Sequence, residues 1–378
     1  MTFVAFFIGF GYAMVVLILA MESFTYKPKA NQNNTVKNEL LGFTVIINFR
    51  NEQEQLPQLL ASITRLLYAR ERVQFIFIND GSSDNSLSLL HAFKAAHHTI
   101  NLTVYNRKPT SASAKKDGIT QALEHASYNH IITTDADCVL PEGWLVAYEE
   151  HYTLFPESIF VAAPVQITAS KSILEQLQAS EMVALQLMTA GGFAVRQPFL
   201  SNGANMSFTK SHFHQVHGYE GNDSVASGDD IFLLEKSAAL NSRACYYLKN
   251  VQAIVSTTPK TSWQEMIAQR ARWAQKGSKT KSLLNKLMSA HVFVANLFML
   301  LAPLLMLLDF IKIKVVITVF ALKLFTDLLV LAMGYRFFEN RYWKWFVMPQ
   351  LVVYPFVVVA VAIKSFTAVR WKGRVASR

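Results

Sequence analysis

The chain has 378 residues, an apolar share of 52% and a formal net charge of +10. The apolar share is high for a purely soluble protein, and the apolar residues concentrate at the two ends, which indicates a membrane protein with a polar middle. Basic residues cluster beside the apolar tail without any nucleic-acid-binding motif, so the charge favours anionic membrane lipids and a phosphorylated substrate over nucleic acid. Cys138 and Cys245 match neither a disulfide framework nor a metal-ligand spacing.

The first apolar segment, residues 3–21, carries no charge and is long enough to cross a bilayer, which needs roughly 20 apolar residues. It has no basic region before it and no small-residue cleavage site, so residues 1–24 are expected to form a retained transmembrane anchor rather than a cleaved signal peptide. Lys27, Lys29 and Lys37 follow it. The positive-inside tendency therefore predicts an outside N-terminus and a cytoplasmic domain after the anchor.

Residues 40–280 are predicted to form an α/β domain, because short apolar runs alternate with helical stretches. The predicted strands are 43–48, 73–78, 102–105 and 130–134, and the predicted helices are 54–67, 85–95 and 114–126. This alternation predicts a mainly parallel sheet with helices on both faces, where ligands bind at the carboxyl ends of the strands. The chain has no dinucleotide-binding glycine motif and no P-loop, so it supports neither a dehydrogenase nor a P-loop NTPase.

The loops after the first two strands carry candidate nucleotide-binding residues. Asp80 ends the second strand and begins a tight turn with Gly81 and Ser82. One interpretation is turn chemistry alone, and the other is recognition of a uracil or ribose edge. Asn51 and Glu52 follow the first strand, so they are expected to lie in the same crevice.

Two carboxylates, Asp135 and Asp137, follow the fourth strand at positions i and i+2, where extended backbone points both to one side. They repel each other unless a cation lies beside them. Hard oxygen ligands suit Mg²⁺ or Mn²⁺, which bridge to substrate phosphates. We therefore predict that both bind a divalent cation that neutralises the diphosphate of a sugar nucleotide. Lys115 and Lys116 are candidate phosphate contacts, with a solvated helix face as the alternative.

Beyond residue 164 the pattern changes. Residues 172–189 predict an amphipathic helix, either as part of the core or as an apolar wall near an acceptor lipid. Asn205 ends the turn-rich stretch 201–205 and is a further candidate for substrate binding. Asp229 and Asp230 open a helix. One acidic residue is enough to cap the helix and interact with its dipole. Asp230 is therefore free to act as general base for an acceptor hydroxyl.

Gln269, Arg272 and Trp273 recur at i, i+3 and i+4, which places them on one helical face. Arginine offers a planar fork for phosphate, and tryptophan offers a platform for a sugar or acceptor. A helix lying on the membrane surface shows the same pattern. We expect this helix to serve both purposes.

The tail, residues 287–364, holds three apolar segments at about 287–308, 315–333 and 346–363. Lys323 and Asp327 lie four residues apart on one face, either as a mutually neutralising pair or as part of a substrate path. The basic tail 365–378 contains Arg370, Lys372, Arg374 and Arg378, which favours a cytoplasmic C-terminus. Four spans would instead place that end outside, so one tail segment is expected to be re-entrant or interfacial.

The ordered motifs resemble the membrane-bound branch of the family-2 glycosyltransferases, which includes cellulose synthase catalytic subunits and ceramide glucosyltransferase. The resemblance covers residues 42–277 and follows the pattern D, D-x-D, (E/D)-D, Q-x-x-R-W. Its members here are Asp80, Asp135 with Asp137, Asp229 with Asp230, and Gln269 with Arg272 and Trp273. It implies a GT-A fold (nucleotide-diphospho-sugar transferase, Rossmann-like), a cytoplasmic active site and an inverting single displacement. We expect an integral protein of the cell (inner) membrane with its catalytic domain in the cytoplasm.

The resemblance also implies roles. Asp80 would bind the nucleotide of a UDP-linked donor, Asp135 and Asp137 the metal-diphosphate, and Asp230 would be the base. The helical triplet Gln269, Arg272 and Trp273 would hold the diphosphate and the acceptor end of the cleft. The chain departs from the pattern where Asp229 replaces the usual Glu and where no glycine precedes the lysine of the 113–116 loop. These departures leave the acceptor open.

Three functions follow as hypotheses. The main expectation is a transferase that glycosylates a membrane lipid, because a polysaccharide channel normally needs more helices around its path. The alternative is a processive β-glycan synthase, which the Q-x-x-R-W motif permits. A non-catalytic nucleotide-sugar or lipid-binding protein, or a transporter, is disfavoured, because binding alone needs no base and a transporter is expected to show repeated helix bundles.

Overall fold

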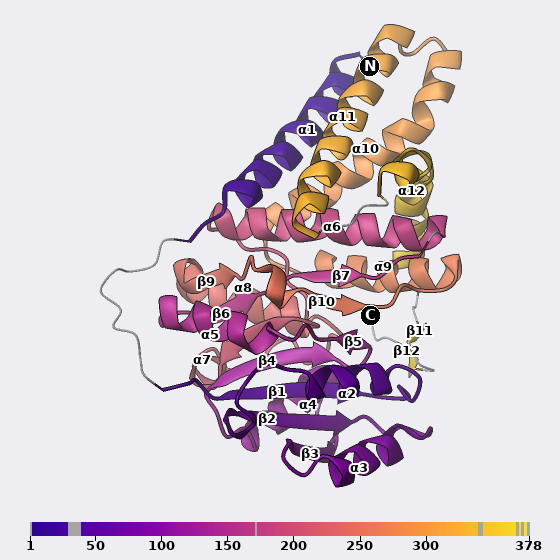
Figure 1. Cartoon of the computed structure of the whole chain (residues 1–378). Coiled ribbons are helices and arrows are strands. Elements are labelled where there is room, and N and C mark those ends of the chain that lie inside the picture. The colour runs from indigo at the N-terminus through magenta and orange to yellow at the C-terminus, as the bar shows by residue number, and fades with distance from the viewer. Residues whose placement is uncertain are drawn as a thin grey trace.

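The computed structural model describes residues 2–28, 39–170, 172–338, 343–367, 370–371 and 374–375. Figure 1 shows a sheet domain at one end and a bundle of long helices at the other, with helix α6 (Ile173–Ala194) lying across the boundary. The chain thus has the polar middle and apolar ends expected from its sequence. Four basic residues used above to orient the chain, Lys29, Lys37, Lys372 and Arg378, lie outside the described residues.

The main sheet has seven strands in the order β3-β2-β1-β4-β8-β6-β9. Strands β1 to β4 pair in parallel, β8 runs antiparallel to β4 and β6, and β6 pairs in parallel with β9. Its strands are β1 (Phe43–Phe49), β2 (Val73–Asn79), β3 (Asn101–Asn106), β4 (His130–Asp135), β6 (Phe160–Ala162), β8 (Met206–Thr209) and β9 (Cys245–Tyr247). The four predicted strands are confirmed.

A second sheet of three strands lies beside the carboxyl end of β4. It is built from β5 (Cys138–Val139), β10 (Val255–Thr257) and β7 (Val165–Ile167). The turn holding Asp137 therefore connects the two sheets.

Helices cover both faces of the main sheet because successive strand residues are apolar on both sides, as parallel strands require. Phe43, Val45 and Ile47 join one core, whereas Ile46 joins the core on the other face. The three predicted helices are confirmed as α2 (Leu56–Thr64), α3 (Ser86–Ala96) and α4 (Ala114–Glu124). The domain also contains α5 (Trp144–Leu154), α7 (Lys210–Gln215), α8 (Asp229–Asn241), and the short helices η1 (Arg70–Arg72), η2 (Ser242–Ala244) and η3 (Val251–Ala253).

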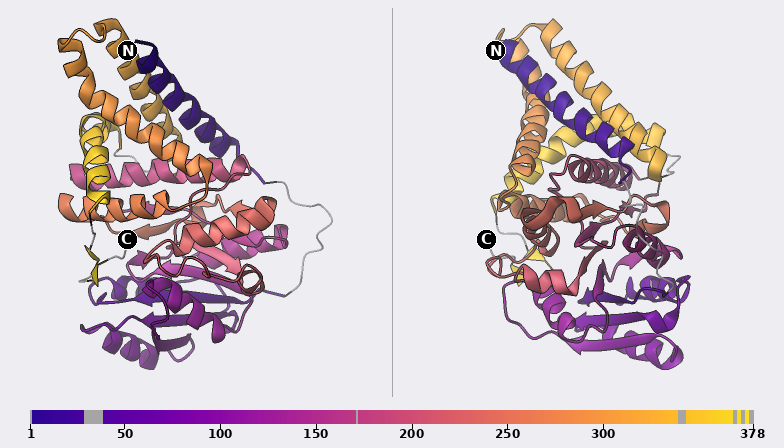
Figure 2. Two further views of the ribbon diagram at one scale, coloured as in Figure 1. Left: turned by 180° about the vertical axis from the view of Figure 1, so that it is seen from behind. Right: turned by 90° about the vertical axis from the view of Figure 1, so that its left-hand side faces the viewer.

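Three helices in the described residues are long and apolar enough to cross a membrane: α1 (Thr2–Thr25), α10 (Leu283–Leu307) and α11 (Ile313–Phe338). Figure 2 shows them rising together from α6, with the N-terminus and the α10–α11 turn at the far end. The third predicted tail segment lies in α12 (Trp343–Ser365), which packs against α6, α10 and α9 (Trp263–Ser278). Beyond it, β11 (Arg370–Trp371) pairs with β12 (Arg374–Val375).

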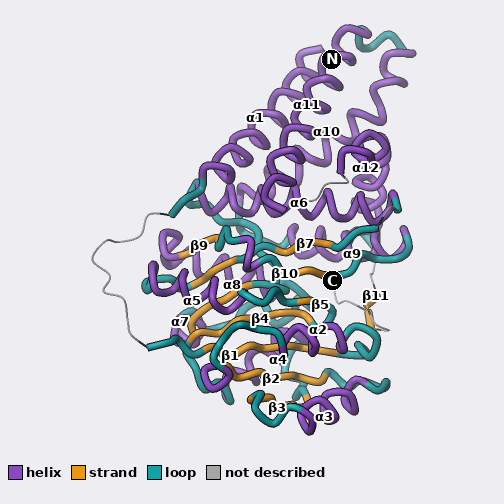
Figure 3. The backbone as a smooth tube through the Cα atoms, viewed as in Figure 1, coloured by secondary structure: helices purple, strands orange, loops and turns teal. Residues whose placement is uncertain are grey.

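Helix α6 lies between the apolar helices and the sheets, as the tube in Figure 3 shows, and most of its residues are buried. Met182 and Met188 are buried, which confirms the core interpretation of residues 172–189. Two glycines allow close crossings. A Cβ atom on Gly191 would lie 2.3 Å from the carbonyl oxygen of Leu19 in α1, and one on Gly334 would lie 2.3 Å from Val183 of α6. Helix α6 is therefore in tight contact with both α1 and α11.

Within the bundle, the mutually neutralising pair expected in the tail is confirmed. Lys323 Nζ donates to Asp327 Oδ2 at 2.5 Å, and Tyr12 of α1 donates to Asp327 Oδ1 at 2.6 Å. The pair therefore connects α11 to α1 as well as neutralising itself.

Candidate active site

Asp80 lies where β2 leaves the sheet, and two arginines hold it. Its backbone N–H donates to the carbonyl of Phe49 at 2.9 Å, which fixes the turn against β1. Arg107 Nε donates to Asp80 Oδ1 at 2.6 Å, and Arg50 Nη1 lies 3.7 Å from Asp80 Oδ2. Sequence reasoning missed both arginines, although each directly follows a strand at the same sheet edge, which is where such residues converge.

Arg107 also donates to Asp117 Oδ2 at 2.6 Å, so one guanidinium joins two carboxylates. Burial alone would raise the pKa of Asp117, but hydrogen bonds from Ser111 and Thr110 lower it below its ordinary value. The group stays ionised and anchors the arginine beside Asp80.

The loops after β1 and β2 form one connected rim. Asn51 adopts a positive φ of 50°, and its backbone N–H donates to Ser82 Oγ at 3.1 Å. Its side-chain oxygen accepts the N–H of Ser83 at 2.8 Å, and the N–H of Glu52 donates to Ser86 Oγ at 2.8 Å. The structure thus brings Asn51 and Glu52 together with the Asp80 turn, as expected.

Lys115 joins the carboxylate at the end of β4 to the start of α8. Its Nζ lies 2.5 Å from Asp135 Oδ1 and 3.4 Å from Asp229 Oδ2, and it donates to the carbonyl of Gly203 at 3.2 Å. Burial alone would lower the pKa of Lys115, but the neighbouring carboxylates raise it above its ordinary value. The side chain is therefore a permanent cation within the acidic cluster.

Asp229 and Asp230 form the first turn of α8 and are 7% and 4% exposed. Gly228 before them has a φ of +88°, which strongly favours glycine. Lys276 Nζ donates to both oxygens of Asp230, at 3.0 and 2.8 Å, and the N–H of Ile231 donates to it at 2.7 Å. Both carboxylate oxygens of Asp230 thus accept from one ammonium group on helix α9.

The two carboxyl groups have different pKa values. Burial raises the pKa of Asp229 despite the nearby Lys115, and the charge of Asp230 raises it further. Burial acts in the same direction on Asp230, but Lys276 and the hydrogen bonds lower the pKa of Asp230 below its ordinary value. Divergence of this kind is typical of paired acids in catalytic sites.

Helix α9 carries the Q-x-x-R-W residues and starts at Ser262, whose hydroxyl accepts the N–H of Glu265 at 3.2 Å. Lys276 follows Gln269 by seven residues and Arg272 by four, so the face that contacts Asp230 continues through both. Burial lowers the pKa of Arg272 to about 10. The sequence reasoning missed Lys276, which extending the helical spacing by one turn would have found.

Trp273 lies at the side of this face. The guanidinium of Arg270 stacks 4.3 Å from its ring, and the Nε of Arg270 donates to Glu181 Oε2 of α6 at 2.6 Å. The ring also packs against a small core that contains Met182. These contacts tie α9 to α6 and fix the position of the motif.

Two residues that the sequence predicts to bind substrate, Lys116 and Asn205, have structural contacts instead. Lys116 is 1% exposed, and its Nζ donates to the carbonyls of Asn222 and Val225 at 2.8 and 2.9 Å, where it supports the loop before α8. Burial lowers its pKa to about 8.

Asn205 is fully buried. Its Oδ1 accepts from Trp144 and Tyr148, and its Nδ2 donates to the carbonyls of Pro164 and Ala253, at distances of 2.7 to 3.0 Å. With every side-chain donor and acceptor used inside the fold, it positions the nearby Gly203 loop.

The expected metal ligands lie at the edge of the crevice. The side chain of Asp135 is 39% exposed, and Asp137 is half-buried with its Oδ1 3.8 Å from the thiol of Cys138. Within the described residues no three His, Cys, Asp or Glu side chains gather as a complete metal site. Two accessible carboxylates fit a cation that takes its remaining ligands from water and a diphosphate.

Comparisons with known proteins agree with this geometry. The model of glycosyl transferase family 2 matches residues 44–191, and that of glycosyl transferase family group 2 matches residues 130–363. Poly-beta-1,6-N-acetyl-D-glucosamine synthase of Staphylococcus aureus is 28% identical over 247 residues, which cover 64% of this chain and 55% of that protein. The Staphylococcus epidermidis enzyme of the same name is 28% identical over 262 residues, which cover 65% and 58%. The chain thus spans little more than half the length of these curated relatives.

Among solved structures, the mannosyltransferase PcManGT from Pyrobaculum calidifontis, in complex with GDP-Man and Mn²⁺, has a TM-score of 0.58. The match covers 97% of this chain and 98% of that one at 14% identity. At this identity the likeness concerns the fold, and it confirms the expected GT-A domain with attached helices.

Proposed function

Because the chain belongs to the family-2 glycosyltransferases, we propose that it synthesises a β-linked polysaccharide, adding sugars from a nucleotide sugar to a growing glycan. The observation that carries this proposal is the contact between Lys276 and Asp230, because it joins the acid pair of α8 to the Q-x-x-R-W helix. The sequence alone favoured a lipid acceptor. The staphylococcal relatives, named as polysaccharide synthases, support the glycan instead, and their names point to N-acetylglucosamine as the transferred sugar.

In this proposal the nucleotide lies over the rim formed by Asn51, Glu52 and Asp80. Arg107 and Arg50 hold Asp80 in place for the base or ribose. UDP is the nucleotide that the sequence resemblance implies, and PcManGT with its GDP-Man supports a nucleotide sugar as donor.

The diphosphate would lie between Lys115 and Arg272, beside Asp135 and Asp137. These two carboxylates would hold Mg²⁺ or Mn²⁺, which would neutralise charge on the leaving diphosphate. The Mn²⁺ in PcManGT supports this assignment. Gln269 and Trp273 would contact the acceptor end of the glycan.

The chemistry is a single displacement at the anomeric carbon. The acceptor hydroxyl oxygen bonds to that carbon, the bond from carbon to diphosphate oxygen breaks, and its electron pair leaves with the nucleoside diphosphate. The hydroxyl proton passes to Asp230, which Lys276 keeps ionised and therefore able to accept it. Asp229, whose pKa is raised, lies next to Asp230 and holds Lys115 in the crevice.

We place α1, α10 and α11 across the cell (inner) membrane, with the catalytic domain in the cytoplasm and α12 at the interface. Three spans return the chain to the cytoplasm after α11, so the basic residues Arg370 and Arg374 fall on the side that the positive-inside rule favours. The packing of α12 against α9 and α6 supports an interfacial position. In this proposed arrangement the number of spans and the charge of the tail agree.

The test uses membranes that contain the full chain, supplied with radiolabelled UDP-N-acetylglucosamine and a panel of other UDP-sugars, with Mg²⁺ or Mn²⁺. Products are separated into lipid-extractable and high-mass fractions, and the latter is digested with a β-1,6-specific hexosaminidase. We expect high-mass product from UDP-N-acetylglucosamine that the hydrolase degrades. Label confined to a discrete lipid band would instead establish a lipid acceptor.

The matched variants are Asp230→Asn and Glu124→Gln, since Glu124 is an exposed carboxylate at the end of α4. Asp230→Asn is expected to abolish transfer while UDP still binds, whereas Glu124→Gln should behave as the unaltered chain. Normal transfer by Asp230→Asn would exclude Asp230 as the base.

A further inference from the structure

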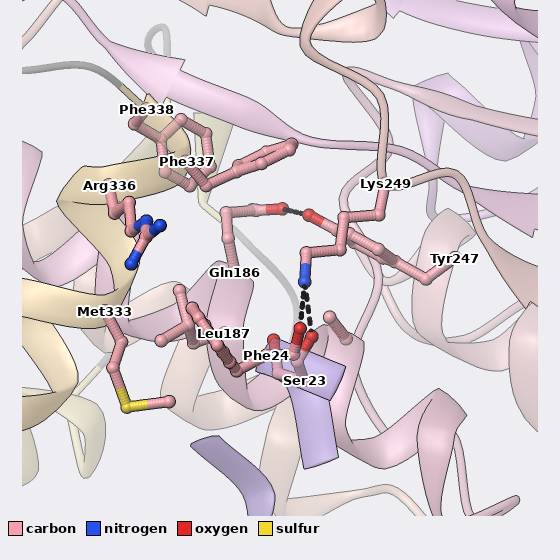
Figure 4. A pocket seen from close by; sticks show the side chains of 11 residues that line it. Ser23, Phe24, Gln186, Leu187, Tyr247, Lys249, Met333, Arg336, Phe337 and Phe338 are labelled. Atoms are coloured by element: carbon pink, nitrogen blue, oxygen red, sulfur yellow. Dashed lines mark hydrogen bonds between the residues drawn. The ribbon is translucent and has the colours of Figure 1, made fainter. Parts of the chain in front are cut away.

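A cavity of about 210 Å³ lies outside the active site, where the ends of α1 and α11 meet α6 and the segment after β9. Figure 4 shows Lys249 on one side of it and Arg336 of α11 on the other. The proposed glycosyl transfer uses none of its residues. Its volume is below the roughly 300–1,000 Å³ of pockets that enclose a whole drug-sized ligand, so it suits part of a larger molecule.

The cavity is positively charged. Among the described residues that line it, Lys249 and Arg336 are cations and none is a carboxylate. Arg336 is exposed and forms no ion pair within the described part of the chain, and its guanidinium lies 5.9 Å from the ring of Phe24. An anion is therefore the complementary ligand.

Lys249 is held in place for such a ligand. Its Nζ donates to the carbonyls of Ser23 and Phe24 at 2.6 and 3.0 Å, at the last turn of α1. An ammonium group has three donors, so one N–H remains for an anion. Burial, and to a lesser degree the charge of Lys27, lowers the pKa of Lys249, and a bound anion would offset both effects.

Much of the remaining wall is apolar. Met333, Phe337 and Phe338 line it from the last two turns of α11, and Leu187 lines it from α6. Both α1 and α11 are long and apolar enough to span, so their ends at the cavity fall in the headgroup layer. Basic pockets between spanning helices on the cytoplasmic side suit anionic headgroups.

We propose that this cavity binds the phosphate of an anionic phospholipid, with Arg336 and Lys249 as its cations and the lipid chains along the apolar wall. This proposal rests on the membrane placement of α1 and α11. The bound lipid would join both helices to the catalytic domain, because Tyr247, the last residue of β9, also lines the cavity and donates to Gln186 of α6 at 2.9 Å.

The experiment measures lipid binding by the purified, delipidated full chain in a neutral detergent. Phosphatidylglycerol, phosphatidylcholine and inorganic phosphate are titrated separately, and binding is followed by thermal unfolding and by native mass spectrometry. We expect phosphatidylglycerol alone to raise the unfolding temperature and to remain bound. Equal effects of phosphatidylcholine, or equal stabilisation by inorganic phosphate, would overturn the proposal.

Variants assign the site. Arg336→Gln is expected to weaken phosphatidylglycerol binding at least tenfold, and Arg336→Lys should retain most of it because the charge remains. Lys364→Gln is the matched control, since Lys364 is an exposed cation in the last turn of α12. All three substitutions are at exposed positions, so the folded chain can be compared directly. Unchanged affinity in Arg336→Gln, or an equal loss in Lys364→Gln, would contradict the assignment.

Discussion

Replacing Lys276 with methionine tests whether α9 controls the charge of Asp230. The side chains of Lys276 and Asp230 are 18% and 6% exposed. Removing one partner of a buried ion pair costs about 3–5 kcal/mol. Because Lys276 is partly exposed and the N–H of Ile231 still donates to Asp230, we expect a loss of about 2–3 kcal/mol. At about 2 °C per kcal/mol, the unfolding temperature should fall by about 5 °C near neutral pH.

The pH dependence follows from the sign of the pKa shift. In the folded chain the pKa of Asp230 is lowered, so its ionisation stabilises the fold above its ordinary pKa, and this contribution is lost as the pH falls through the folded pKa. Without Lys276, burial dominates and raises that pKa. The difference in unfolding temperature between the two proteins should therefore be largest near pH 7–8 and shrink in acid.

The assays are thermal unfolding and the rate of sugar transfer, each measured across pH. The acid limb of the rate profile should move to higher pH in Lys276→Met, because Asp230, the proposed base, would become protonated at a higher pH. Lys276→Arg should restore the profile, and Lys279→Met is the control, because Lys279 is exposed at the end of the same helix. An unchanged acid limb together with a pH-independent stability difference would refute the reasoning.

Three further substitutions address other parts of the chain. Lys323→Met leaves Asp327 without its cation in the bundle, so it should lower the free energy of unfolding by about 3 kcal/mol, seen as a lower unfolding temperature. The double variant of Lys323→Met with Asp327→Leu should recover most of this loss, and no recovery would argue against a pairing role. Gly334→Leu places side-chain atoms where a Cβ would already lie 2.3 Å from Val183, so it should reduce the yield of folded protein in size-exclusion chromatography, and a normal profile would contradict the close crossing. Asp137→Ala should abolish the dependence of UDP binding on Mg²⁺ or Mn²⁺ in calorimetry, whereas chelation of the ion should weaken UDP binding to the unaltered chain; equal affinity of the unaltered chain with and without the ion would remove the metal assignment.

The first half of the sheet was predictable because its signals are local. Residues 43–135 alternate apolar strands with amphipathic helices, and each of those elements appears within a few residues of its predicted range. The short strands β6 to β10 have three or four residues each. Strands this short show no recognisable hydrophobic periodicity, and they pair with strands that are distant in the sequence. The sequence therefore did not predict them.

Candidate site residues that directly follow strands could be predicted from the sequence. Those carried by helices from the far end of the chain could not. Asp80 and Asp135 were placed at one edge by the parallel sheet alone. The contact from Lys276 to Asp230 depends on how α9 packs on α6, which no local pattern encodes. Asn205 shows the opposite failure, because a turn-rich stretch suggested an accessible polar residue where the fold buries a fully bonded one.

The hydrogen bond between Tyr12 and Asp327 joins residues 315 positions apart, and this has a consequence for biosynthesis. At roughly 5–20 residues per second, the ribosome needs about 15–60 s between making these two side chains. In the membrane placement proposed above, α1 spends that interval in the bilayer without the partners that α6 and α11 later provide. During that time the hydroxyl of Tyr12 does not yet have Asp327 as its hydrogen-bond acceptor. Assembly of this enzyme therefore includes a long-lived early stage in which a single helix awaits the rest of its chain.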